Sequence, residues 1–345
     1  MGRARNNGAL RGAFVSSLLI GLTIWAWAVS GDGATAHALF RQREPLVFAR
    51  LRETVRQNRA SGAVRQNRAN APRVPAPVRF RDVSGRGLVV QAWVNDEGPF
   101  DFAVDTGAGS TILSPRVAQA ARVAITNGRT VNLSGLSGVR GSAREASVRS
   151  IAVGDPGNYL PGRGSIIVAD SLPSDLDGVL DPSETFYPLG YAIDFRDELL
   201  RAFDPRVEPV SRRDIPADGD VVAWLTDGAT RRPFVMLEGG RRALIDTGSG
   251  LGLGLPPEAA RSLGVVGGRG DGREGGLRDL GRGQVGASRV EPATVRVGAL
   301  VLRHVPTDLL AGASADAPII LGRDALRPFE LTFDPVSRLI RFAPR

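Results

Sequence analysis

Two copies of one short pattern, far apart in the chain, place the strongest limit on its fold. Residues 102–113 read FAVDTGAGSTIL and residues 243–254 read ALIDTGSGLGLG, so that Asp105 and Asp246 are separated by 141 positions. A long, fixed period of this kind indicates a duplicated structural unit. The chain is therefore expected to fold as two similar halves, each carrying one Asp-Thr-Gly loop.

Further landmarks repeat at almost the same spacing, which extends the duplication over most of the chain. Four landmarks at one near-constant period are hard to attribute to chance. They are the two Asp-Thr-Gly loops, Gly135-Leu136 with Gly276-Leu277, Val179-Leu180 with Ile320-Leu321, and the end strands that align Ile193 with Leu331.

The segments within each copy are short, rich in β-branched residues and alternating, and Gly, Asp, Asn and Pro separate them. Such runs are typical of antiparallel strands and hairpins. Helical patterns are confined to residues 114–123 and 256–265, each with a proline near its first turn. We therefore predict an all-β fold with short helices, made of two duplicated, closed, barrel-like lobes related by a pseudo-twofold axis.

Composition divides the chain into an N-terminal extension and the duplicated body. We expect a targeting segment at residues 1–38 and a flexible, Arg-rich linker at residues 39–80, where the sequence VRQNRA occurs twice. The first lobe is predicted at residues 81–209 and the second at residues 215–345, with a charged, proline-containing connection between them.

The start of the chain has the features of an export signal. Residues 14–29 are apolar and uncharged, and Arg3, Arg5 and Arg11 precede them. The Ala-His-Ala sequence at residues 36–38 matches a signal-peptidase cleavage pattern, which favours a cleaved signal. A retained anchor is the alternative, and it implies membrane association through residues 14–29. Either reading places the body outside the cytoplasm, in the periplasm or secreted.

Composition excludes several kinds of chemistry. The chain has no Cys and only two His, which rules out disulfides, thiolate nucleophiles and a multi-histidine metal site. We therefore expect no metal and no cofactor. The formal net charge of +8 comes from residues 1–80, which contain 13 Arg and three acidic residues. Because the rest holds 31 Arg and 33 acidic residues, it offers no basic surface for nucleic acid.

The two Asp-Thr-Gly loops suggest paired carboxylate chemistry. Each follows an apolar strand, so Asp105 and Asp246 are expected on loops pressed into apolar surroundings. If a pseudo-twofold axis relates the halves, the two carboxyl groups can face one another and share one proton. The ionised member could then deprotonate a water molecule while the protonated member polarises a peptide carbonyl.

These motifs resemble those of the aspartic peptidases, and most closely two retropepsin-like domains fused in one chain. The resemblance runs from Leu88 to the C-terminus, and its strongest part joins LIDTGSG at residues 244–250 to IILGRDAL at 319–326 and ELTFDPVSRLIRF at 330–342. It implies that a peptide or protein is the substrate. Because both halves of the site lie on one chain, a monomer is expected.

The resemblance also implies roles for individual residues. Asp105 and Asp246 would be the catalytic pair, and Thr106 and Thr247 would link their loops through hydroxyl-to-backbone hydrogen bonds. The Gly-rich hairpins at residues 133–142 and 276–283 occupy the place of flaps that close over substrate. The implied substrate-binding residues are Thr106, Gly107, Thr247, Gly248, Ser249, Gly135, Leu136, Gly138, Gly276 and Leu277.

The chain departs from the family pattern at three points. Asp181 stands where the family has Gly, and a third carboxyl group there could raise the pKa of the pair or obstruct the site. Neither hairpin carries the tyrosine typical of pepsin flaps. Ala108 follows the first loop and Ser249 the second, and a bond from the Ser249 hydroxyl to Asp246 would make Asp246 the ionised member.

Taken together, the residues predict an exported aspartic endopeptidase. Asp181 and the irregular first lobe support one alternative, a catalytically inactive relative that binds peptides or acts as a scaffold in the cell envelope. A second alternative is a protein that binds the envelope surface through its Arg-rich linker, in which case function would not need either aspartate.

Overall fold

The computed structural model describes residues 73–345 except 163, 266–273 and 280–281. The chain divides into two units, Met1–Ala71 and Pro72–Arg345, and everything below concerns the second. The predicted targeting segment and most of the predicted linker lie outside the described residues. No helix in the described part of the chain is long and apolar enough to cross a membrane.

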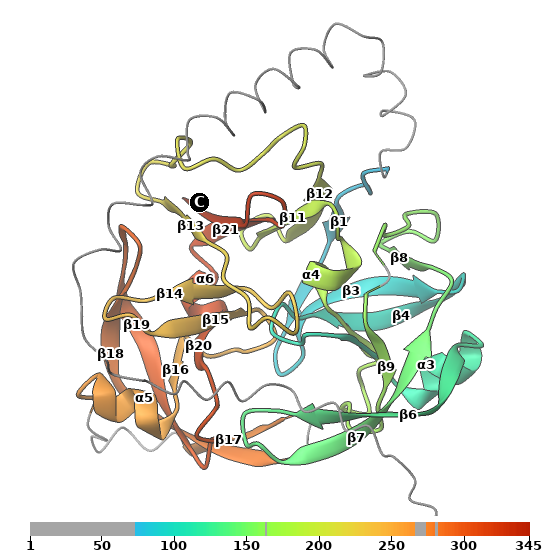
Figure 1. Ribbon diagram of the computed structural model, residues 1–345, viewed down its shortest axis with the longest axis horizontal. Helices are drawn as coiled ribbons and strands as arrows, with labels where there is room; N and C mark the ends of the chain where they lie inside the picture. Colours follow the sequence, from blue (N-terminus) through green and yellow to red (C-terminus); the bar gives the residue numbers. More distant parts are fainter. Residues whose placement is uncertain (1–72, 163, 266–273, 280–281) are drawn as a thin grey trace, which may run out of the picture. The chain divides into compact units, whose positions relative to one another are not determined.

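The all-β prediction is confirmed, since strands dominate and the helices are short. The described strands form three sheets (Figure 1). Alternation of apolar and polar residues accounts for strands buried on one face, such as residues 284–297, whereas residues 178–180 and 319–322 are apolar and buried throughout. The predicted helices are present but shorter than expected, at α3 (Pro115–Ala120) and α5 (Pro257–Ser262).

The first half of the body contributes a nine-stranded sheet from the described residues. Its strands lie in the spatial order β2-β3-β4-β10-β5-β9-β7-β6, and β8 pairs with β3. The bounds are β2 (Arg81–Val83), β3 (Gly87–Val94), β4 (Glu97–Val104), β5 (Thr111–Leu113), β6 (Ala124–Ser134), β7 (Arg140–Ser147), β8 (Ile151–Val153), β9 (Ile166–Val168) and β10 (Gly178–Leu180). A one-turn helix, α4 (Pro182–Thr185), follows β10.

The second half contributes seven described strands in the order β14-β15-β20-β16-β19-β18-β17. The bounds are β14 (Phe234–Met236), β15 (Arg242–Asp246), β16 (Leu253–Leu255), β17 (Glu274–Arg278), β18 (Gln284–Val297), β19 (Leu300–Ala311) and β20 (Ile319–Gly322). A one-turn helix, α6 (Arg323–Leu326), follows β20. This order of elements repeats that of the first half.

The same parallel strand pair positions the Asp-Thr-Gly loop in each half. β4 runs parallel to β10 with Val104 opposite Leu180, and β15 runs parallel to β20 with Ile245 opposite Leu321. All four residues are almost completely buried. Each aspartate therefore follows a buried strand whose direction and register are fixed by a second buried strand.

A third, six-stranded sheet of described strands joins the two halves, in the order β1-β12-β11-β21-β22-β13. Antiparallel pairing places Ile193 opposite Leu331, the two residues that the sequence period aligns. Equivalent residues that face each other in an antiparallel pair have a local twofold axis between them. The bounds are β1 (Val78–Arg79), β11 (Gly190–Asp194), β12 (Leu199–Phe203), β13 (Asp220–Ala223), β21 (Phe329–Asp334) and β22 (Leu339–Pro344).

The shared sheet means that the halves are not separate lobes with separate cores. Tyr191 of β11 stacks on Phe333 of β21 with ring centroids 4.5 Å apart, and both side chains are buried. One continuous cluster of buried apolar side chains includes residues from both halves. The ordered body also begins earlier than residue 81, because Val78 lies in β1 and Phe80 is buried.

Candidate active site

The two Asp-Thr-Gly loops cross and hydrogen-bond to each other through their threonines. The Thr106 hydroxyl donates to the Ile245 carbonyl at 2.6 Å, and the Thr247 hydroxyl donates to the Val104 carbonyl at 2.9 Å. Each threonine N–H also donates to the opposite hydroxyl, at 3.1 Å in both cases. Because both threonines are fully buried, these four bonds fix the position of one loop against the other.

Replacing Thr106 by Val tests this crossing, because Val has nearly the same shape but lacks the hydroxyl. The change leaves the Ile245 carbonyl and the Thr247 N–H unpaired in a buried place, so we expect the free energy of unfolding to fall by about 3 kcal/mol. Chemical denaturation measures this. Thr106→Ser keeps the hydroxyl and should cost less, and equal losses in the two variants would contradict the role given to the hydroxyl.

The crossing brings the Asp105 and Asp246 carboxyl groups close enough for each to change the pKa of the other. Each carboxyl group also lies against the glycine of the opposite loop. A Cβ atom added at Gly107 would lie 2.8 Å from Asp246 Cγ, and one at Gly248 would lie 2.8 Å from Asp105 Oδ1. Glycine is required at both positions because a side chain there would push the opposite carboxyl group away.

Backbone donors hold one oxygen of each carboxyl group. The Gly107 N–H donates to Asp105 Oδ1 at 2.7 Å, and the Ser249 N–H donates to Asp246 Oδ1 at 3.0 Å. The expected bond from the Ser249 hydroxyl to Asp246 is not formed. That hydroxyl instead accepts a hydrogen bond from the Leu251 N–H at 3.3 Å. The tight turn after Gly248 directs the backbone N–H, rather than the side chain, at the carboxylate.

Burial raises the pKa of both carboxyl groups, but their other surroundings differ. The negative charge of Asp246 raises the pKa of Asp105 further, and the Gly107 N–H opposes it. For Asp246, the Ser249 and Gly248 N–H groups and the positive charge of Arg323 all lower the pKa against burial. These differences favour the proton on Asp105 and the ionised form of Asp246.

Arg323, which our sequence analysis did not select, lies beneath the second loop. Its guanidinium Nη1 donates to the Thr247 carbonyl at 2.7 Å and to the Gly248 carbonyl at 3.0 Å. The residue is only 6% exposed, so its charge acts on Asp246 with little screening by water. The sequence feature that could have pointed to Arg323 is its place directly after Gly322, which ends a buried strand.

The equivalent place in the first half holds no arginine. Gly322 is level with Asp246, and a Cβ atom there would collide with the Leu251 carbonyl. By the same register Asp181 is level with Asp105. Its side chain is fully buried, and its Oδ1 accepts a hydrogen bond from the Ser183 N–H at the start of α4.

The tips of the two Gly-rich hairpins contact each other and the second half (Figure 1). The Ser137 N–H of the β6–β7 turn donates to Asp279 Oδ2 of the β17–β18 turn at 2.8 Å. The Ser314 N–H donates to the Leu136 carbonyl at 2.8 Å, and Gly138 packs against Ser314. The tip of the first hairpin is thus bound to residues of the second half.

Apolar contacts accompany these bonds. Leu136 packs against buried side chains of the second half, including Leu251, Val285 and Leu310. Leu277 of the second hairpin packs on the same cluster, whereas a Cβ atom added at Gly276 would meet nothing within 4 Å. Among the residues predicted to bind substrate on the hairpins, Leu136 and Leu277 therefore pack on the same apolar cluster, whereas Gly276 has open space beside it.

The Asp279 carboxylate should hold the two hairpin tips together, a role that we call the latch. It accepts hydrogen bonds from the Ser137 N–H and, at 2.9 Å, from the Gly283 N–H. In Asp279→Ala we expect the Ser137 amide to exchange about tenfold faster, as hydrogen bonds to a charged group are lost. Hydrogen-exchange mass spectrometry measures this. Asp316→Ala removes an exposed acid from a neighbouring loop and is the control, and unchanged exchange in Asp279→Ala would contradict the latch.

Comparison with known proteins bears on this geometry. A family model described as aspartyl protease matches residues 90–171, a stretch that contains Asp105, Thr106 and the first hairpin. No curated protein was found to match the chain. The match over residues 90–171 supports an aspartic peptidase family for the chain.

Proposed function

We propose that the chain is an aspartic endopeptidase that hydrolyses peptide bonds with a water molecule activated between Asp105 and Asp246. The observation that carries the proposal is the crossing of two equivalent loops, which places each carboxyl group against the glycine of the opposite loop. The aspartyl protease match over residues 90–171 supports the same reaction. The positive charge of Arg323 acts on Asp246, and this favours Asp246 as the ionised member of the pair.

In the proposed mechanism, the Asp246 carboxylate takes a proton from water as the water oxygen attacks the peptide carbonyl carbon. The Asp105 carboxyl group donates its proton to the carbonyl oxygen, which yields a neutral tetrahedral diol. Transfer of the proton from Asp246 to the amine nitrogen, with return of a diol proton to Asp105, then breaks the C–N bond. The pair ends in its starting protonation state, so no other group is consumed.

The proposal extends to the architecture and the compartment. The repeated order of elements and the paired threonines support two fused retropepsin-like halves that form one site in a monomer. The apolar residues 14–29 and the Ala-His-Ala sequence that follows support export, to the periplasm or beyond, with or without an anchor in the inner membrane. The substrate class is a peptide or protein rather than nucleic acid.

One observation favours a second candidate, a catalytically inactive protein that binds peptides or acts as a scaffold in the envelope. Leu136 occupies apolar surface of the second half, and the hairpin tips are bonded to each other. A chain whose hairpins stayed in this position would exclude substrate. The two candidates differ in whether the hairpins open.

The test is to incubate the purified full-length chain with a diverse peptide mixture from acid to alkaline pH and to sequence the products by mass spectrometry. The peptidase proposal expects internal cleavage that a statine-type inhibitor blocks, since such inhibitors present a hydroxyl group to the carboxyl pair. Peptides that stay intact at every pH, with an inhibitor that still binds, would favour the inactive relative.

A further inference from the structure

Asp181 is a buried acid that the proposed mechanism does not use. It ends the strand that fixes Asp105, since the Asp105 N–H donates to the Leu180 carbonyl at 3.0 Å. Its side chain is 0% exposed, and it caps α4 by accepting from the Ser183 N–H at 2.8 Å through Oδ1. The other oxygen, Oδ2, has no hydrogen-bond partner among the described residues.

The groups that surround Asp181 do not provide a free positive charge. Acidic or neutral groups face it from three elements: Asp105 at the end of β4, Glu184 on α4, and the Tyr191 hydroxyl of β11, which hydrogen-bonds to Ser183 at 2.8 Å. Glu184 is itself paired with Arg231 at 2.6 Å.

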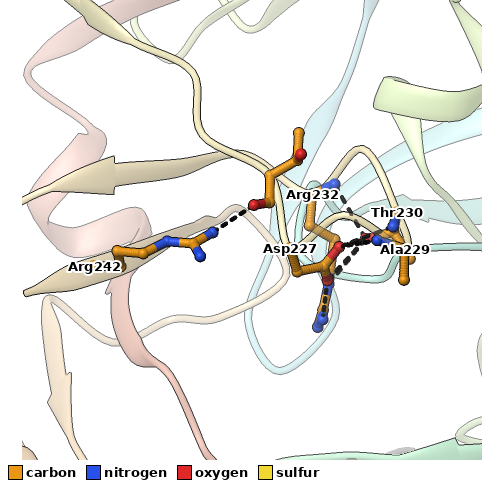
Figure 2. A network of polar contacts seen from close by, with 6 residues as sticks. Asp227, Ala229, Thr230, Arg232 and Arg242 are labelled. Carbon is orange, nitrogen blue, oxygen red and sulfur yellow. Dashed lines mark hydrogen bonds and ion pairs between the residues drawn. The ribbon is translucent and has the colours of Figure 1, made fainter. Parts of the chain in front are cut away.

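Arg232, ahead of β14, is the cation that acts on Asp181, but its guanidinium group is bound elsewhere. Asp227 binds the Arg232 guanidinium group (Figure 2). Arg232 Nη2 and Nε donate to Asp227 Oδ2 at 2.5 Å and 3.1 Å, respectively. Backbone and hydroxyl donors of Thr230 hold the same carboxylate. Burial raises the pKa of Asp227, but the bonds from Arg232 and from the Thr230 N–H outweigh it and lower that pKa, which favours an ionised Asp227 beside Arg232.

An ionised carboxylate at Asp181 would therefore be buried without a counter-ion, which is costly. Burial, followed by the negative charge of Glu184, raises the pKa of Asp181 to about 8. A neutral carboxylic acid fits the site better. It can still accept from the Ser183 N–H, and it adds no charge behind Asp105.

We propose that Asp181 is a positioning residue that acts through Asp105: it is protonated in the active protein, and its ionisation at alkaline pH ends activity. Three carboxyl groups then hold two protons between them, one on Asp181 and one shared by Asp105 and Asp246. Loss of the Asp181 proton puts a second negative charge behind Asp105. That charge repels the negative charge of the pair, which passes from Asp246 to Asp105 when the neutral diol forms, so the cluster no longer supports the reaction.

The inference rests on the proposed peptidase function, and its first test is the pH profile of kcat/KM for the full-length protein and for Asp181→Asn. The Asn side chain keeps the Oδ1 acceptor for Ser183 and is always neutral. We expect wild type to lose activity with a midpoint near pH 8, because burial raises the pKa of Asp181 to about 8. In Asp181→Asn this midpoint should rise by about one pH unit or more, with kcat at acid pH within about twofold of wild type.

Two controls make the result specific. Asp181→Gly copies the residue found at Gly322 and should also move the alkaline midpoint upward, although it loses the cap of α4. Asp175 is paired with Arg86, and its own side chain is 51% exposed. Asp175→Asn should leave the profile unchanged. An alkaline midpoint that stays in place in Asp181→Asn would overturn the proposal, as would a tenfold loss of kcat at acid pH.

A second measurement needs no activity and separates the two proposals. A group whose pKa is higher in the folded than in the unfolded protein stabilises the fold at low pH, and this is lost as pH rises through the folded value. We compare the unfolding temperature of Asp246→Asn with that of the double variant Asp246→Asn, Asp181→Asn. As pH rises from about 4 to 8, the single variant should lose stability relative to the double variant. Parallel curves would overturn the protonated Asp181 even if the enzyme is active, and diverging curves would uphold it even if no peptide is cleaved.

Discussion

Asp246→Asn is expected to lower kcat/KM for peptide cleavage by about 10³-fold or more, because it removes the base that activates water. Asp105→Asn should cause a loss of similar size through the opposite step, since an amide can donate a hydrogen bond to the carbonyl but cannot transfer a proton. The side chains are nearly the same size, so neither change disturbs the crossing of the loops.

Loss of folding can be separated from loss of chemistry in these variants. Burial raises the pKa of both Asp105 and Asp246 in the folded protein. Each acid therefore contributes stability at low pH that is lost as pH rises through its folded pKa, whereas Asn does not titrate. Above that range both variants should unfold at the same temperature as wild type or higher. An inactive variant that unfolds early, or one that retains a tenth of wild-type activity, would contradict the assignment.

Gly248→Ala is expected to have the second-largest effect, because no space exists for its methyl group. A Cβ atom at Gly248 would lie 2.5 Å from Asp105 Oδ2 and 2.8 Å from Oδ1, so the carboxyl group must move out of contact with Asp246. We expect at least a 10²-fold loss of kcat/KM, as expected when a reacting group is displaced by about 1 Å. Overpacking should also lower the free energy of unfolding by about 2 kcal/mol.

Gly286→Ala is the matched control for this variant. It adds the same methyl group in β18, where the nearest atom, Ala311 Cβ, would lie at an ordinary contact distance of 3.5 Å. Steady-state kinetics and chemical denaturation should show little change there. If Gly248→Ala proved as active as Gly286→Ala, the close contact between the Asp105 carboxyl group and the opposite loop could not exist.

The sequence predicted those parts of the fold and the site that local pattern determines. Alternating β-branched residues predicted strands, and the 141-residue period predicted that Asp105 and Asp246 have equivalent surroundings. Both features can be read from short local motifs, even though the two copies of the motif lie 141 residues apart. The pairing of Ile193 with Leu331 follows from the same period once a twofold axis is allowed.

Other features depend on contacts between distant residues and could not be predicted. Arg323 is an arginine in a buried place, and two distant partners make that place favourable: the carbonyl groups of a loop 75 residues away and the carboxylate of Asp82. Asp279 was inside a predicted hairpin, but its bond to Ser137 spans 142 residues. The shared six-stranded sheet was missed for the same reason, because its strands come from both halves and from residues before the predicted boundary.

The most direct test of the central claim is peptide cleavage in ¹⁸O-labelled water by the full-length protein and by Asp246→Asn, with the products analysed by mass spectrometry. Direct attack by an activated water predicts that wild type cleaves internal bonds and places one ¹⁸O atom in each new carboxyl group in a single turnover. Asp246→Asn should give no products above background. Equal cleavage by the variant, or an acylated protein trapped before the label enters, would contradict a water molecule activated between Asp105 and Asp246.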